Sequence, residues 1–212
     1  MPVVVLISGG GTNLQALIDA AGRDLPVEIR AVISNEPDAY GLERARRAGI
    51  AAEVVNHRDH PDREAFDRAL AERIDRHSPK LVVLAGFMRI LTPYFVHRYA
   101  GRLLNIHPSL LPKFKGLHTH RRALEAGEKV HGASVHFVTE ALDGGPVVLQ
   151  ARVPVKPDDT PEILAARVLE KEHVIYPMVV RWFAEGRLEL RDGRVWFDGR
   201  PLARPLRLDE LE

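Results

Sequence analysis

The chain contains no cysteine among its 212 residues, which excludes disulfide bonds, thiolate catalysis and thiolate metal ligands. It also carries almost no net charge, +1 at pH 7, so bulk electrostatics favour neither nucleic acid nor an anionic membrane as a partner. No apolar run approaches the roughly 20 residues of a membrane span. The N-terminal residues lack the basic segment of a signal peptide. We therefore expect a cytoplasmic protein.

Strand and helix patterns alternate over the first half of the chain. Continuous apolar runs, typical of strands buried on both faces, are separated by segments with apolar residues at helical spacing. The expected strands span residues 2–8, 27–34, 52–56, 81–85 and 103–106. The expected helices span residues 13–21, 39–48 and 63–77. This alternation predicts parallel βαβ units.

The pattern changes after Leu117, where longer strands follow each other through a turn. The expected elements are a helix over 119–126, strands over 133–139 and 146–155, a helix over 160–185 and a hairpin over 188–197. Together they predict one α/β domain over residues 1–212. Its open, twisted sheet would have parallel N-terminal βαβ units and antiparallel C-terminal strands. The tail after about residue 200 is expected to be poorly ordered.

The most informative segment is LLNIHPSLLP, residues 103–112. An apolar run ends in Asn105 and His107, and prolines then stop regular structure. Residues two apart on a strand point to the same face. An amide donor beside an imidazole suits acyl transfer, because one group can hold an oxyanion and the other can move a proton. Asp143, in LDGGPV, would complete such a site. The competing interpretation is a structural histidine and an ordinary Asp-Gly-Gly turn.

The segment SGGGTN, residues 8–13, joins a strand to a helix. Glycines allow close backbone approach, and a helix N-terminus favours an anion, so the loop predicts a phosphate site with Thr12 as the N-cap. A tight structural turn is the alternative. Leu14 stands where a dinucleotide fingerprint needs glycine, and no P-loop lysine follows. The loop therefore favours a sugar phosphate over NAD or ATP.

Other polar residues have no pattern that predicts catalysis. His118, His120, His131 and His136 have no ligand spacing that favours a metal, and surface or supporting roles are expected. Glu172 lies on the long helix, where a solvated face is the default interpretation. Residues 87–91 follow a strand at the carboxyl edge of the sheet, which predicts a pocket wall.

Five segments in order make the chain resemble the phosphoribosylglycinamide formyltransferase family. They are VVLISGGGTNLQALI, VVLAGFMRILTP, LLNIHPSLLPKFKGLHTHRRAL, HGASVHFVTEALDGGPVVLQ and KEHVIYP. The resemblance runs from the first strand to about Asp198. It departs from the family pattern at Gly10, where Asn is frequent, and at Lys115, where Pro is common.

The resemblance implies transfer of a formyl group from 10-formyltetrahydrofolate, a co-substrate, to the amine of glycinamide ribonucleotide in purine biosynthesis, with no metal. It implies a catalytic group of Asn105, His107 and Asp143. The substrate-binding residues it implies are Gly11, Thr12, Asn13 and Glu172. The folate-binding residues it implies are Arg63, Met88, Arg89, Ile90, Leu91, Asn105, Thr139, Glu140, Ala141, Leu142 and Asp143. A homodimer is left open.

Two related activities compete with this interpretation. A 10-formyltetrahydrofolate hydrolase shares the catalytic half but carries an additional N-terminal domain, whereas here a strand begins at residue 2. Methionyl-tRNA formyltransferase carries a C-terminal RNA domain, whereas this chain is nearly neutral. A NAD-dependent oxidoreductase is disfavoured by the interrupted glycine pattern. A non-catalytic ligand-binding protein would not need the Asn-His-Asp set.

Overall fold

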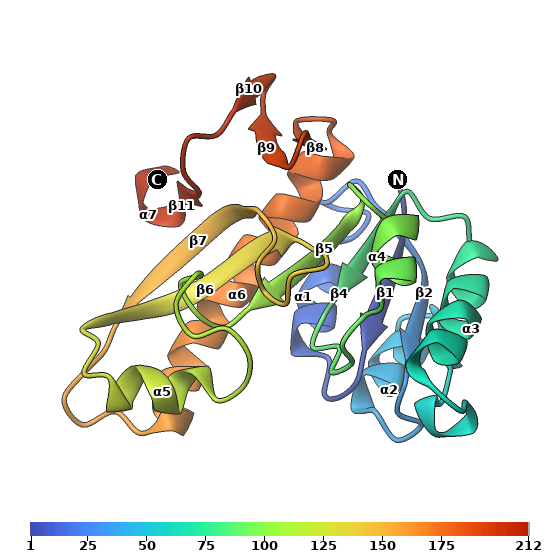
Figure 1. Ribbon diagram of the computed structural model, residues 1–212, viewed down its shortest axis with the longest axis horizontal. Helices are drawn as coiled ribbons and strands as arrows, with labels where there is room; N and C mark the ends of the chain where they lie inside the picture. The colour runs from blue at the N-terminus through green and yellow to red at the C-terminus, as the bar shows by residue number, and fades with distance from the viewer. Residues whose placement is uncertain (212) are drawn as a thin grey trace. The chain divides into compact units, whose positions relative to one another are not determined.

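The computed structural model describes residues 1–211, which cluster into two compact units: the first is Met1–Asn105, and the second begins at Ile106. Figure 1 traces the chain from the blue N-terminal strands to the red C-terminal segment. The fold is mixed α/β with a mostly parallel sheet, as predicted. None of the described helices is both long enough and apolar enough to cross a membrane.

The first unit is built on parallel strands whose order is β5, β4, β1, β2, β3. The strands are β1 (Pro2–Ile7), β2 (Glu28–Ser34), β3 (Ala51–Val54), β4 (Leu81–Leu84) and β5 (Leu103–His107). The helices are α1 (Thr12–Ala20), α2 (Tyr40–Arg47), a 3-10 turn (His57–Asp59), α3 (Arg63–Asp75) and α4 (Pro93–Arg98). The run Val3–Ile7 is almost completely buried, which explains its continuous apolar sequence. The predicted strands and helices of this unit lie within two residues of those observed.

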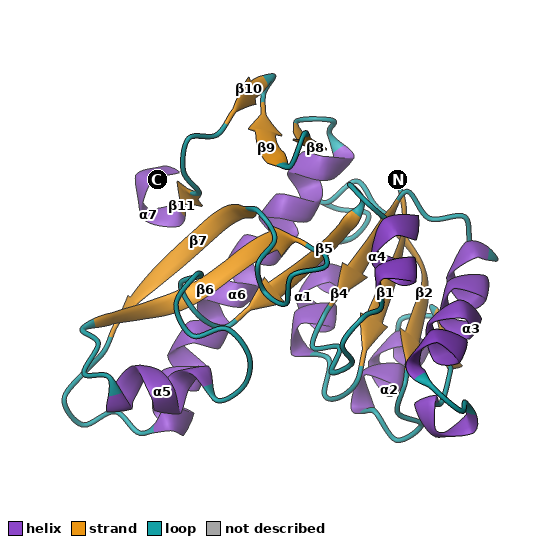
Figure 2. Ribbon diagram, in the orientation of Figure 1, coloured by secondary structure: helices purple, strands orange, loops and turns teal. Residues whose placement is uncertain are grey.

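The second unit begins at the end of β5 and places two long antiparallel strands against a long helix. Its helices are α5 (Thr119–Glu125), α6 (Pro161–Ala184) and α7 (Leu208–Leu211). Its strands are β6 (Val130–Phe137), β7 (Val147–Pro154), β8 (Leu188–Arg191), β9 (Arg194–Phe197), β10 (Arg200–Pro201) and β11 (Leu206–Arg207). Figure 2 shows α6 running along β6 and β7. The antiparallel pair and the β8–β9 hairpin confirm the predictions for this half.

Two segments differ from the prediction. The sequence predicts a poorly ordered tail after about residue 200, whereas in the structure β11 pairs in parallel with β7 and Leu208 of α7 is buried. The apolar residues Leu206 and Leu208 stabilise this end, although the surrounding prolines and charges favour loop. Helix α4 was not predicted. It is only six residues long, and its start signal is Thr92, which caps the helix, followed by Pro93.

Candidate active site

His107 is the last residue of β5 and is buried in the second unit. Its Nε2 lies 2.8 Å from the Phe114 carbonyl oxygen. A carbonyl only accepts hydrogen bonds, so Nε2 must carry a proton and donate it. The other ring nitrogen, Nδ1, lies 3.6 Å from Oδ1 of Asp143. The Phe114 carbonyl thus fixes the orientation of the ring and leaves Nδ1 on the side of the Asp143 carboxylate.

The Asp143 carboxylate is held by a backbone amide of a neighbouring loop. Its Oδ2 accepts a hydrogen bond from the Gly116 amide at 2.8 Å, and both its side chain and that of His107 are 8% exposed. Asp143 adopts a left-handed conformation (φ 49°), which Asp tolerates better than most residues. A Cβ on Gly145 would lie 1.8 Å from the Phe137 carbonyl oxygen. Close backbone approach therefore requires the second glycine of the LDGGPV motif, Gly145.

Asn105 precedes His107 by two residues on β5 and is half-buried. In strand geometry the two side chains point to the same face, as predicted from the sequence. The backbone of Asn105 is in register with Leu84 of β4.

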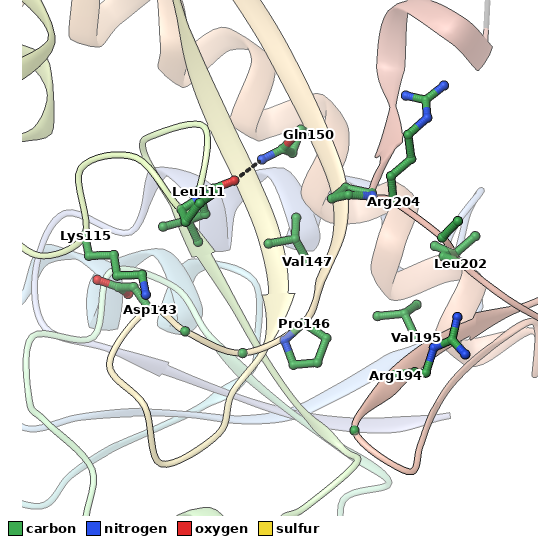
Figure 3. Close-up of a pocket in the computed structure, with 16 residues that line it drawn as sticks. Leu111, Lys115, Asp143, Pro146, Val147, Gln150, Arg194, Val195, Leu202 and Arg204 are labelled. Carbon is green, nitrogen blue, oxygen red and sulfur yellow. Dashed lines mark hydrogen bonds between the residues drawn. The ribbon is translucent and has the colours of Figure 1, made fainter.

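Asp143 also lines a cavity of about 410 Å³ in the second unit. In Figure 3, Lys115 and Asp143 lie at one end of it and Arg194 and Arg204 at the other. Between them the wall includes the apolar residues Pro146, in the loop that follows Asp143, and Val147, the first residue of β7. The basic residues of this wall were not identified from the sequence, because they come from segments that are far apart in the chain and carry no motif.

Two of the four histidines considered as ligands form a hydrogen-bonded pair beside this site. His120 Nδ1 lies 3.1 Å from His131 Nε2. Burial lowers the pKa of His131 to about 4 and also lowers the pKa of His120. His118 is exposed, whereas His131 and His136 are buried, so a surface role holds only for the first. Within residues 1–211 no group of three or more His, Cys, Asp or Glu is arranged to hold a metal.

The glycine loop, residues 8–13, lies in the first unit. Gly11 has φ 76°, and a Cβ there would lie 2.8 Å from Cα of Gly41, so only glycine fits. The predicted cap was wrong: the N-cap of α1 is Gly11, and Thr12 is the first helical residue. The first hydrogen bond within α1 runs from the Gln15 amide to the Gly11 carbonyl. The amides of Thr12 and Asn13 therefore lie in the first turn, ahead of the helix's own hydrogen bonds. This is the geometry that binds anions at a helix N-terminus.

An arginine from the next helix holds the glycine loop. Arg44 of α2 donates from Nε to the Gly10 carbonyl at 2.7 Å and from Nη1 to Gln15 at 3.3 Å. Its guanidinium lies over the Tyr40 ring at 4.9 Å. The sequence pattern alone did not identify this residue.

The expected folate segment, residues 88–91, is attached to the same loop. The Met88 amide donates to Ser8 Oγ at 2.8 Å. The far end is held by Asp67, a buried residue not identified from the sequence, which accepts bonds from the amide and hydroxyl of Thr92 at 2.7 Å each. Burial raises the pKa of Asp67. Met88 and Ile90 remain 65% and 53% exposed, which leaves apolar surface for a ligand.

The remaining predicted residues divide by unit. Arg63 opens α3, and Arg89 lies 5.6 Å from the Phe66 ring in the first unit. The loop Thr139–Asp143 lies in the second unit, with Leu142 56% exposed. Glu172 of α6 is buried, at 7% exposure, rather than on the solvated face that helical spacing predicted. Its burial indicates a specific role, because an acidic residue is rarely buried without partners.

Comparison with known proteins gives consistent matches. A model of the formyl transferase family matches residues 1–180. The chain is 59% identical over 203 residues to phosphoribosylglycinamide formyltransferase of Escherichia coli (strain K12), covering 95% of this chain and 96% of that protein. It is 48% identical over 189 residues to the trifunctional purine biosynthetic protein adenosine-3 of Homo sapiens, covering 89% of this chain and 19% of that protein. The solved phosphoribosylglycinamide formyltransferase of Coxiella burnetii, in complex with CHES, matches with a TM-score of 0.93 and 55% identity, covering 97% of this chain and 99% of that chain.

Proposed function

We propose that this chain, which belongs to the formyl transferase family, transfers the formyl group of 10-formyltetrahydrofolate to the amine of glycinamide ribonucleotide in purine biosynthesis. The products are formylglycinamide ribonucleotide and tetrahydrofolate. The observation that carries the proposal is the His107–Asp143 pair, in a chain that aligns over nearly its whole length with formyltransferases. The comparisons give no support to the hydrolase alternative.

The proposed reaction requires neither a metal nor a covalent enzyme intermediate. The neutral amine attacks the formyl carbon, so an N–C bond forms and the carbonyl electrons move to oxygen. The amide of Asn105 and the imidazolium of His107 stabilise this oxyanion. Its collapse breaks the bond between the formyl carbon and the folate nitrogen. That nitrogen receives the proton that the attacking amine gives up, by way of Nδ1 of His107 and a water held by Asp143.

The glycine loop is assigned to the phosphate of glycinamide ribonucleotide. Gly11, Thr12 and Asn13 would bind it through backbone amides, since the left-handed Gly11 directs the chain into the start of α1. Buried Glu172 is assigned to the glycinamide end, where a carboxylate pairs with an amine. This division predicts that changes in the loop affect one substrate only.

The folate site is assigned to residues that combine exposed apolar side chains with charged and polar ones. They are Arg63, Met88, Arg89, Ile90, Leu91, Asn105 and Thr139–Asp143. Met88, Ile90 and Leu142 offer surface to an aromatic ring system, and Arg63 offers a cation to a carboxylate of the folate. The proposed setting is the cytoplasm, with small molecules as the partners and neither nucleic acid nor membrane. The proposal takes the chain as one catalytic domain and does not depend on a homodimer.

One assay tests this function. The purified protein is incubated with 10-formyltetrahydrofolate, with and without glycinamide ribonucleotide, and tetrahydrofolate, formate and the formylated amine are measured. We expect tetrahydrofolate to form only with the amine present and in one-to-one ratio with the formylated product. Formate released at the same rate in both incubations would identify a hydrolase instead. The His107→Ala variant controls for uncatalysed transfer.

A further inference from the structure

Both members of the His107–Asp143 pair depend on one short backbone segment, residues 114–117, called the 114–117 loop below. The Phe114 carbonyl accepts from His107 at 2.8 Å, and the Gly116 amide donates to Asp143 at 2.8 Å. A shift of this loop therefore changes the orientation of the imidazole and of the carboxylate together. No side chain of the loop needs to take part.

The loop adopts a backbone conformation that most residues avoid. Phe114 has φ 53°, Gly116 has φ 84°, and His118, directly after the loop, has φ 56°. For Phe and His the left-handed region is sparsely populated because Cβ crowds the backbone. Such a segment keeps its conformation only where neighbouring groups impose it.

Arg122 supplies that restraint from α5. Its Nη1 donates to the Lys115 carbonyl at 2.6 Å and to the Leu117 carbonyl at 2.9 Å, one on each side of Gly116. Its guanidinium also lies 5.5 Å from the centre of the Phe114 ring. The same ring meets His131 edge-on at 6.2 Å. The Arg122 side chain thus bonds to the two carbonyls that flank Gly116, whose amide holds Asp143. It also packs on Phe114, whose carbonyl holds His107.

We infer that Arg122 is a positioning residue for the reaction: it holds the 114–117 loop so that its backbone orients His107 and Asp143. The inference rests on the proposed function for its kinetic test, although the loop geometry can be measured without it. Arg122 lies on α5, which contacts α6, so the restraint comes from a packed element of the second unit. Arg122 itself touches neither reacting group.

The test compares Arg122→Ala with Arg121→Ala. Arg121 is the exposed neighbour on the same helix and serves as the matched control. We expect Arg122→Ala to lower kcat by about ten- to a hundredfold, because small misplacement of catalytic groups has effects of this size. The KM for glycinamide ribonucleotide should change by less than about threefold, since the glycine loop is not altered. Arg121→Ala should match wild type.

A spectroscopic measurement separates positioning from general loss of structure. With ¹⁵N-labelled histidine, the Nε2–H proton of His107, assigned from its absence in His107→Asn, reports the bond to Phe114. We expect its solvent exchange to accelerate about tenfold or more in Arg122→Ala and to stay unchanged in Arg121→Ala. If Arg122→Ala does not fold, Arg122→Lys is measured instead, because lysine keeps the charge but lacks the planar fork.

The outcomes are distinct. Slower turnover together with faster exchange at His107 supports the inference. Wild-type kcat in Arg122→Ala, or a slower variant whose His107 signal is unchanged, overturns it. If wild type itself transfers no formyl group, the proposed function fails, and the exchange measurement alone then decides whether Arg122 holds the loop.

Discussion

Two loops, one in each unit, are held in the same manner and differ in how much the sequence reveals of them. The glycine loop is held by Arg44, which donates to the Gly10 carbonyl, and the 114–117 loop by Arg122, which donates to the Lys115 and Leu117 carbonyls. The first presents amides that suit a ligand. The second presents a carbonyl and an amide to two of the protein's own side chains. In the proposed function, the glycine loop therefore acts in substrate binding and the 114–117 loop in the chemical step.

The largest effect is expected at the pair that the 114–117 loop holds. His107→Ala and Asp143→Asn should each lower kcat by about a thousandfold, by analogy with the loss of an oxyanion donor or of a correctly oriented imidazole. The fold should persist, because both side chains lie at the end of a strand or in a turn. Steady-state kinetics with circular dichroism checks this. Near wild-type turnover in either folded variant would remove that residue from the mechanism.

The glycine loop should respond through binding instead. Gly11→Val places a side chain 2.8 Å from Cα of Gly41 and forces a β-branched residue to φ 76°. We expect the KM for glycinamide ribonucleotide to rise about a hundredfold while the KM for folate stays within about threefold, and stability to fall by roughly 1–3 kcal/mol. Gly10→Ala is the control, since its Cβ meets nothing within 4 Å. Equal changes in both KM values would mean that the loop is only a structural turn.

Stability at acid pH depends on the histidine that packs against the 114–117 loop. The folded-state pKa of His131, about 4, lies below the ordinary value of about 6.5, so the unfolded chain binds the proton more readily. The stabilisation from neutral His131 is complete above about pH 6.5 and is lost as pH falls towards 4. We expect a loss of about 2 kcal/mol between pH 7 and pH 5, measured by urea unfolding. His131→Gln should flatten this slope, whereas exposed His118→Asn should not. An unchanged slope in His131→Gln would contradict the assignment.

The smallest effect is expected at Arg44. Arg44→Ala removes its bond to the Gly10 carbonyl but leaves Gly11 in place, so the KM for glycinamide ribonucleotide should rise about three- to tenfold with kcat nearly unchanged. Arg46→Ala, an exposed residue of the same helix that pairs with Glu43, is the control. A drop in kcat without a rise in KM would remove the distinction between the two loops.

The comparison also explains what the sequence could predict. Buried strands such as Val3–Ile7 carry an unbroken apolar pattern that can be recognised in the sequence. Close contacts require glycine at Gly11 and Gly145, so these positions also stand out in the sequence. The roles of Phe114 and Gly116 come from backbone atoms, which every residue has, and no motif marks them. Arg122 and Arg44 are ordinary arginines on polar helices until the fold brings them to a carbonyl. For Glu172 the sequence pattern was misleading, because helical spacing predicts an exposed residue and tertiary packing buries it.

If Arg122 acts through the His107–Asp143 pair that the 114–117 loop holds, its effect must depend on His107, and a double-mutant cycle measures this dependence. Single-turnover formyl transfer is measured for wild type, Arg122→Ala, His107→Ala and the double variant, with enzyme in excess so that slow transfer is detected. We expect Arg122→Ala to slow transfer about ten- to a hundredfold in the wild-type background and to have almost no further effect when His107 is already absent. An equal slowing by Arg122→Ala in both backgrounds would contradict it.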